Sequence, residues 1–372
     1  MSSVDTWVPG RRSVAGWVTY DLANTVFALG VQGLYFAIWV TEDQGYPDSA
    51  LALATAAAML AVVFAGPLVG ARTDHAPRRK PALVATTVAA VAATALLGIG
   101  PILLSLAVYA VALIAFNLGS VVYDALLPDV STPQNRGWVS GLGVSVGYAG
   151  SALAVGAGAL LLDRIGYPGL FRTLALMFLV FSLPCFLWLR ERPRPRPAGP
   201  APSWRRVISN LAVSWRTASR HPGVVRFLVG RFFYTDAINT LIGGFLVVFA
   251  QQEIGFDAGQ VQALTIIGIA SAMVGGLVAG WLVDRAGPRI ILHGVLTVWI
   301  ATMAIGIAAA AANLEDLGWV VGVAGGLALG ATWAADRAYM ARLTPAHLYG
   351  EFYGLYGTVG RFATILGPLL WA

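Results

Sequence analysis

Long apolar stretches separated by short polar ones run through the whole chain. Each stretch is about as long as the roughly 20 residues that a helix needs to cross a bilayer. The stretches cover 15–40, 50–71, 81–99, 102–127, 138–162, 171–190, 224–250, 260–283, 289–311, 317–341 and 351–372. The pattern predicts an all-α integral membrane protein with eleven spans.

The composition supports this class and excludes others. Hydrophobic residues make up 58% of the chain and charged residues 11%, with a mean hydropathy of +0.72, whereas a soluble chain has about 25% charged residues. The net charge of +6 comes from loop residues, so nucleic acid is not expected as a partner. Cys185 is the only cysteine, which excludes an intrachain disulfide and a cysteine metal site. A cleavable signal peptide is not expected, because the first apolar run is too long.

Basic residues concentrate in alternate loops, which predicts the orientation. Cytoplasmic loops carry an excess of Lys and Arg, so we expect a cytoplasmic N-terminus. The residues then inside are Arg11, Arg12, Arg72, Arg78, Arg79, Lys80, Arg136, Arg285, Arg289, Arg337 and Arg342. The opposite loops hold Arg164 and Arg172 and are otherwise acidic, with Glu42, Asp43, Asp48, Asp163, Glu253, Asp257, Glu315 and Asp316. The excess of arginine over lysine and the lack of targeting signals favour a prokaryotic plasma membrane.

A short polar motif occurs twice, near the start of the first and seventh apolar runs. Both copies have the frame Asp-x-x-Asn-Thr, beginning at Asp21 and at Asp236. On a helix these positions share one face. A carboxylate in a span costs about 2.5–3.5 kcal/mol, so it normally faces a bundle interior or a cavity. We expect the two polar stripes to meet at an interface between two repeats.

Other segments repeat in the same order, which defines two halves. The pairs are Gly70-x-x-x-Asp74 with Gly280-x-x-x-Asp284, Asp124 with Asp336, and Gly137-x-x-x-Gly141 with Gly350-x-x-x-Gly354. We predict a six-helix N-terminal half (1–190), a cytoplasmic linker (191–223) and a C-terminal half with five spans (224–372). A twelfth helix would complete the symmetry, and its absence favours truncation over a naturally short chain.

The linker has two parts. Alternating Arg and Pro from Arg192 to Pro197 predicts an extended segment. Apolar residues then recur at helical spacing from Trp204 to Ala218 among arginines. This predicts a helix that either lies on the inner leaflet as an amphipathic anchor or serves as a plain cytoplasmic linker.

A basic loop after Gly-x-x-x-Asp, once in each half, resembles the signature of the major facilitator superfamily. Other stretches resemble one of its branches, the autophagy-related vacuolar amino-acid exporter family and its prokaryotic relatives of unknown substrate. They are 20–25, 123–129, 136–141 with Gly147 and Tyr148, 234–240, and 351–357 running to Gly367 and Pro368. The resemblance implies a major-facilitator-like fold and an amino acid as the leading substrate.

Several polar residues within spans are candidates for substrate or ion coupling. The set comprises Asp21, Asn24, Tyr148, Asp236, Asn239 and Arg361. Asp21 and Asp236 could bind a substrate ammonium group or carry a proton, or could be structural hydrogen-bond acceptors. Arg361 lies near the bilayer midplane, where a guanidinium needs a carboxylate or an aqueous cavity. It could bind a substrate carboxylate or pair with Asp21 or Asp236. Arg231 lies nearer the inner end and is expected to snorkel to the surface.

A second set is predicted to form a gate on the inner side. Carboxylates at helix ends can pair with loop arginines and with the N-termini of neighbouring helices. The residues are Asp74, Arg78, Arg79, Lys80, Asp124, Asp284, Arg285, Arg289 and Asp336. The alternative is topogenic charge, which accounts for the basic residues but not for the repeated aspartates.

The sequence therefore predicts a secondary active transporter working by alternating access. We expect a monomer that carries a small polar organic solute, most simply an amino acid, with protons as a candidate coupling ion. A proton-coupled drug or sugar carrier and a non-transporting membrane sensor or scaffold remain alternatives. No nucleotide fingerprint, catalytic constellation or metal spacing occurs in the sequence, so we expect neither an enzyme nor a cofactor.

Overall fold

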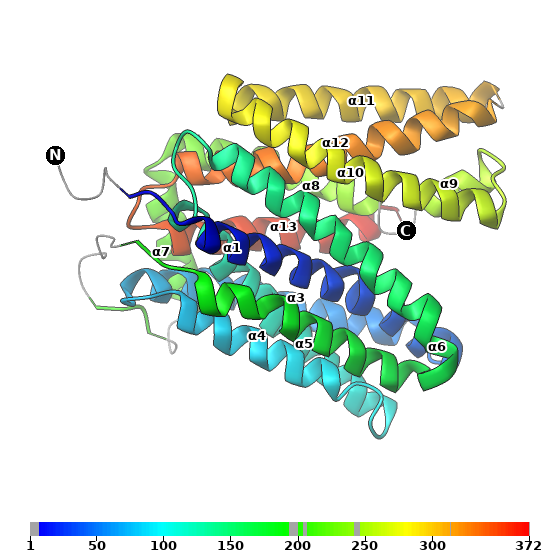
Figure 1. The fold of residues 1–372 in the computed structure, drawn as a ribbon, viewed down its shortest axis with the longest axis horizontal. Coiled ribbons are helices and arrows are strands. Elements are labelled where there is room, and N and C mark those ends of the chain that lie inside the picture. The colour runs from blue at the N-terminus through cyan, green and yellow to red at the C-terminus, as the bar shows by residue number, and fades with distance from the viewer. Residues whose placement is uncertain (1–6, 193–199, 204–206, 242–245, 313, 372) are drawn as a thin grey trace.

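The computed structural model describes residues 7–192, 200–203, 207–241, 246–312 and 314–371. Within these ranges the regular elements are helices, most of them lying side by side (Figure 1). Among the described residues, seven helices are long and apolar enough to cross a membrane. The all-α prediction is thus confirmed for the described chain, and the count of eleven spans stays a prediction.

The first half begins with one long helix. It comprises α1 (Arg11–Thr25), a π-helical segment η1 (Val26–Tyr35), α2 (Phe36–Ile38) and a second π segment η2 (Trp39–Asp43). The widening to π geometry starts directly after the Asp21 motif, and such segments are frequent at functional sites. The half continues with α3 (Asp48–His75), α4 (Lys80–Ala95), α5 (Ile102–Asp124), a short 3-10 turn η3 (Leu127–Asp129) and α6 (Arg136–Trp188).

The second half repeats this plan with shorter pieces at its start. Its helices are α8 (Pro222–Thr240), α9 (Leu246–Gln252), α10 (Ala258–Ala286), α11 (Pro288–Ala312), α12 (Glu315–Leu343) and α13 (Tyr349–Trp371). Between the halves, α3 packs along α13, and α6 packs along α10 and α12.

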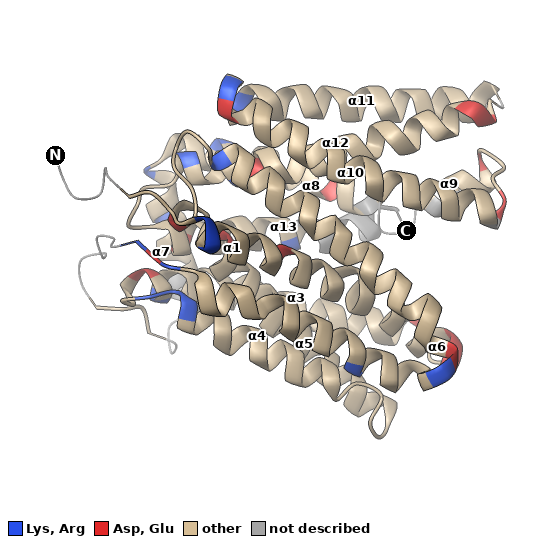
Figure 2. Ribbon diagram, in the orientation of Figure 1, with Lys and Arg blue, Asp and Glu red and all other residues tan. Residues whose placement is uncertain are grey.

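Lys and Arg gather at the end of the bundle where α1 begins, as Figure 2 shows. We call this the basic end; α3 and α10 end there, and α4, α6 and α13 begin there. One buried apolar cluster at this end combines residues of both halves, from Trp17 to Tyr356. A second cluster, from Ala23 to Phe178, lies within the first half, and a third, from Ala250 to Ala309, within the second. A smaller cluster also joins the halves, with Val144 of α6 packed among residues of the second half such as Ile238 and Trp299. The larger part of the shared core therefore lies toward the basic end.

Helix α6 covers two of the predicted runs and bends sharply between them. The bend is at Gly166, with φ 65° and ψ 177°, a conformation that essentially only glycine adopts. Pro168 follows and packs against Gly98 in the turn after α4. The two predicted runs thus form an antiparallel pair around one residue.

Changing Gly166 to alanine should lower thermal stability by roughly 1–3 kcal/mol, the cost of holding a Cβ in this conformation. The matched control is Gly156→Ala in the same helix, where a Cβ would meet open space and alanine should be neutral or slightly stabilising. Thermal unfolding of the purified proteins in detergent measures both. Equal melting temperatures for the two variants would contradict the assignment.

Helix α7 (Val207–Ser219) lies at the basic end and packs against α3, α8 and α13. Ser214 and Ala218 are buried, whereas Val213 and Trp215 are exposed. The helix therefore contacts both halves and still presents an apolar edge outward. Residues 193–199 of the predicted extended segment lie outside the described residues.

Candidate functional site

An arginine of the second half holds two carboxylates of the first. Nη1 of Arg337 on α12 lies 2.9 Å from Oδ2 of Asp21 on α1, and its Nε lies 3.0 Å from Oδ1 of Asp124 on α5. The guanidinium also lies 5.3 Å from the ring centre of Trp17 and 5.4 Å from that of Tyr123, which stack on each other. Asp21 thus pairs with α12, and the meeting of the two acidic stripes stays a prediction.

Asp236, the counterpart of Asp21 on α8, has a different environment. Its Oδ1 is buried and accepts no hydrogen bond from the described residues, and the same holds for Oδ1 of Asn24. Asn239 lies one turn further along α8 and is partly buried. The duplicated motif therefore contains two buried oxygens with free hydrogen-bonding capacity, one in each half.

Asp336 is fully buried within the second half rather than at the interface. Its carboxylate accepts hydrogen bonds from Arg231 Nε (2.9 Å), Tyr234 Oη (2.5 Å) and Tyr356 Oη (2.8 Å). Arg231 also stacks over the Tyr356 ring at 3.6 Å and is only 5% exposed. The expectation that Arg231 snorkels is wrong, because Asp336 compensates its charge inside the bundle.

Arg361 on α13 reaches across to the first half. Its Nε donates to Oδ1 of Asn117 on α5 at 2.8 Å, and its Nη1 donates to the Gly357 carbonyl at 2.7 Å. Asp21 is paired with Arg337 instead, and no ion pair joins Arg361 to a carboxylate among the described residues. Of the two alternatives for Arg361, pairing with Asp21 or Asp236 is therefore not what the structure shows. Tyr148 on α6 packs with apolar residues of the second half, including Trp333.

The two repeated aspartates at the basic end hold the opposite half by the same contact. Asp74 at the end of α3 accepts hydrogen bonds from the backbone N–H groups of Gly350 and Glu351, both at 2.8 Å. Asp284 at the end of α10 accepts from Gly137 at 2.7 Å and Trp138 at 2.8 Å. A helix N-terminus has unpaired N–H groups and a partial positive charge. Each carboxylate therefore caps a helix of the other half.

These contacts depend on very close helix packing. A Cβ at Gly70 would overlap the carbonyl of Gly350, and a Cβ at Gly141 would overlap that of Gly276. Hydroxyls add further links: Ser140 donates to the Ala334 carbonyl (2.9 Å). The glycine spacing in the repeated motifs thus allows the halves to approach within backbone contact.

The basic residues predicted for the gate bind mostly within the first half. Arg79 is buried, pairs with Asp74, and lies 3.8 Å from Asp129. Lys80 donates its Nζ hydrogen to the Leu189 carbonyl at 3.1 Å. These contacts of Arg79 and Lys80 stabilise the end of α3 and so fix the position of Asp74.

The remaining three arginines of the predicted gate are exposed. Arg285 lies over the Trp281 ring at 3.6 Å, and Arg78 and Arg289 face outward. Their positions suit topogenic charge better than a contact between the halves. Arg337, which the sequence analysis counted only among the inner basic residues, does make such a contact. The one sequence signal for it is the doublet Asp336-Arg337, whose equivalent in the first half is Asp124-Ala125.

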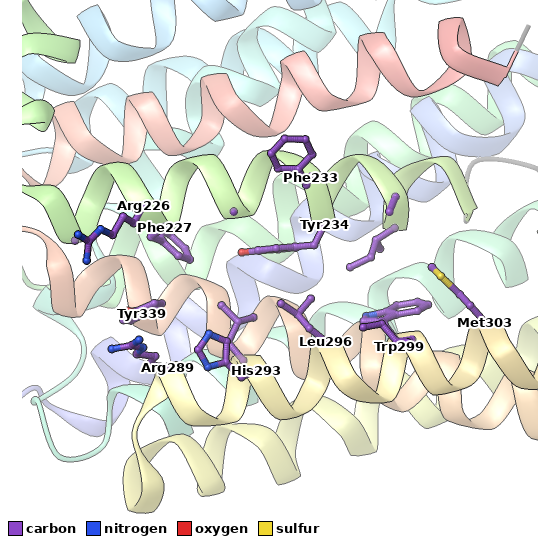
Figure 3. Close-up of a pocket in the computed structure, with 16 residues that line it drawn as sticks. Arg226, Phe227, Phe233, Tyr234, Arg289, His293, Leu296, Trp299, Met303 and Tyr339 are labelled. Atoms are coloured by element: carbon purple, nitrogen blue, oxygen red, sulfur yellow. The ribbon is translucent and has the colours of Figure 1, made fainter.

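A groove of about 600 Å³ runs between α8 and α11 (Figure 3). Its walls are largely apolar, with Phe233, Leu296 and Trp299 along its length and Arg226 and Arg289 at one end. It opens on the outside of the second half, since Phe233 is 68% exposed. Asp21, Asp236 and Arg361 do not line it.

Two helical halves joined by buried polar contacts, with helices long and apolar enough to cross a membrane, are the architecture of a multi-pass membrane protein. The chain belongs to the Major Facilitator Superfamily, whose family model matches residues 21–368. It is 25% identical over 379 residues to the MFS-type transporter YxiO of Bacillus subtilis, an alignment covering 95% of this chain and 86% of that protein. It is 27% identical over 266 residues to autophagy-related protein 22 of Yarrowia lipolytica, covering 62% of this chain and 44% of that protein.

Solved structures share the fold. The human organic anion transporter MFSD10 superimposes with a TM-score of 0.76 at 18% identity, covering 98% of this chain and 93% of that one. The proton:xylose symporter XylE gives 0.68 at 14% identity, covering 97% and 86%. The predicted family and its transporter fold are confirmed, and at these identities the similarity concerns the fold alone.

Proposed function

We propose that this chain is a secondary active transporter that moves an amino acid, or a closely similar small polar solute, by alternating access. The observation that carries the proposal is the paired capping of α13 by Asp74 and of α6 by Asp284. Both contacts join the halves at one end of the bundle, and both must break for that end to open. Rocking of two repeats about a central site is the usual motion of such transporters.

An amino acid fits the charges at the interface. Arg361 reaches from the second half and donates to an amide and a carbonyl rather than to a carboxylate among the described residues, so it can bind a substrate carboxylate. Asp236 and Asn24 each hold a buried oxygen able to accept from an ammonium group. The resemblance to the vacuolar amino-acid exporters favours the same substrate class, and protons are the coupling ion we propose.

We further propose that the basic end faces the cytoplasm of a plasma membrane, following the positive-inside rule. The structure then represents the state closed toward the cytoplasm. The three-part division into 1–190, 191–223 and 224–372, the eleven spans and the monomeric state are proposed with it. Helix α7 supports the division, since it lies between the halves in sequence and contacts both.

The internal symmetry of the two halves indicates where a twelfth helix would pack. In the first half, residues 167–188 lie beside both α1 and α4: Phe178 contacts Tyr20, and Pro168 contacts Gly98 after α4. The helices equivalent to α1 and α4 are α8 and α11, and the apolar groove lies between them. We propose this groove as the position of a twelfth helix.

Changing Arg361 to glutamine should reduce amino-acid transport at least 10-fold, because the substrate carboxylate loses its cationic partner. Counterflow of a labelled amino-acid mixture into proteoliposomes measures this, with and without a pH gradient. Arg289→Gln, at an exposed arginine of the same half, is the control and should keep parental flux. If the parent protein exchanges sugars or drugs but no amino acid, the proposed substrate is wrong.

A further inference from the structure

We infer that Arg337 couples cation binding at Asp21 and Asp124 to opening of the basic end, an inference that rests on the alternating-access function proposed above. Arg337 belongs to the second half and both carboxylates belong to the first. The contact therefore joins the same two bodies as the helix caps, but through side chains whose charge a ligand can change.

The cluster carries one negative charge in excess. Two carboxylates face one guanidinium, with side chains 8% (Asp21), 16% (Asp124) and 13% (Arg337) exposed. Uncompensated charge in a low-dielectric interior is costly. Arg361 offsets part of this charge from a distance, without contacting either carboxylate. The triad therefore attracts a further cation at the carboxylates themselves, and that cation is a proton, since the solute ammonium group is assigned to Asp236 and Asn24.

Other ionisable groups around the triad have partners of their own. Tyr123 on α5 donates its hydroxyl to the Trp17 carbonyl at 3.2 Å, and Tyr353 on α13 donates to the Arg337 carbonyl at 2.8 Å. These hydroxyls are therefore committed to backbone oxygens rather than to the two carboxylates.

The positive charges of two further arginines, Arg361 and Arg231, interact with the Asp124 carboxylate at long range. Both arginines make their direct contacts with other groups. Arg361 donates to Asn117, and Arg231 pairs with Asp336. Tyr148 on α6 also lies close enough to Asp21 for an electrostatic interaction, and its ring packs with apolar residues of the second half, including Trp333. A cation that enters the triad thus competes directly with Arg337.

Two neighbouring residues of α12 bind different halves of the protein. Asp336 binds Arg231 of its own half, whereas Arg337 binds the other half. Successive residues on a helix point about 100° apart, which allows one doublet to serve both bodies. The first half has alanine at the position equivalent to Arg337, Ala125, so the triad exists once and not twice.

The inference predicts a stepwise release. Neutralising one carboxylate leaves Arg337 paired with the other, so the halves stay joined. Neutralising both, by a proton on each, removes every anionic partner of Arg337 in the triad. The basic end then opens when the hydrogen bonds from Asp74 and Asp284 to the helix N-termini also break.

A cysteine reporter tests this without knowledge of the substrate. Ser140 is fully buried between the halves, and the native Cys185 is buried, so S140C in a C185A background should react with a polar maleimide only when the basic end opens. We expect R337Q and the double variant D21N/D124N to raise the labelling rate at least 10-fold. D21N or D124N alone should raise it no more than about 3-fold, and R337K should restore slow labelling.

The matched controls are D316N and R342Q, at exposed residues near the two ends of α12. They change a charge on the same helix without touching the triad and should leave labelling within about 2-fold of the parent. Size-exclusion profiles and melting temperatures identify any variant that fails to fold. Parental labelling rates in folded R337Q and D21N/D124N, or equal increases in the controls, would overturn the inference. Fast labelling in R337Q combined with a parent that moves no amino acid would instead remove the proposed substrate and leave the role of Arg337 standing.

Discussion

Replacing Asp74 and Asp284 together with asparagine should shift the protein strongly toward a state open at the basic end. Each carboxylate accepts two backbone hydrogen bonds from a helix of the other half. Hydrogen bonds to charged groups contribute about 1.5–3 kcal/mol each, and asparagine keeps one neutral acceptor per site. We expect each single variant to raise the open fraction about 10-fold and the pair to raise it about 100-fold.

Spin labels on exposed residues of the two halves can measure the shift. R78C and R289C, in the C185A background, place one label on each half near the basic end, between α3 and α4 and at the start of α11. Pulsed dipolar spectroscopy should give one short distance in the parent and a longer, dominant one in D74N/D284N. Asparagine is preferable to alanine at position 74 because Arg79 also pairs with that side chain.

The control is D316N, at an exposed aspartate at the other end of α12. It removes the same charge without touching the caps, so its distance distribution should match the parent. An unchanged distribution in D74N/D284N would show that the caps do not hold the halves together. Unequal effects of D74N and D284N would also be informative, since only Asp74 supports a buried arginine.

Repetition made the caps predictable from sequence. A carboxylate at the C-terminus of its own helix opposes the helix dipole, so its recurrence at Asp74 and Asp284 indicated a partner elsewhere. The glycines at the start of α6 and α13 repeat in the same register. A gate in which carboxylates bind helix N-termini is therefore among the contacts that the sequence predicts.

Pairings between distant charges were not predictable in the same way. Arg337 meets Asp21 across 316 positions of sequence, and Arg361 meets Asn117 across 244. Which of several intramembrane charges pair depends on helix rotation and on which halves touch. The sequence required only that Arg361 find some partner, and it left open whether that partner was a carboxylate, an amide or a solute.

Asp336→Ala should destabilise the fold strongly. The fully buried Asp336 accepts from Arg231, Tyr234 and Tyr356. Removing one partner of a buried ion pair costs about 3–5 kcal/mol, because the remaining charge is left uncompensated. We expect loss of folded protein on solubilisation, or a large drop in melting temperature in detergent.

A double substitution separates the charge penalty from simple loss of packing. In R231M/D336L both charges are replaced by apolar groups of similar volume, and such exchanges are often neutral or stabilising in other proteins. The double variant should therefore be more stable than D336A, although it carries more changes. D336N should fall between them, because its amide oxygen still accepts hydrogen bonds. If R231M/D336L is as unstable as D336A, the hydrogen bonds to the two tyrosines, rather than the buried charge, dominate this part of the second half.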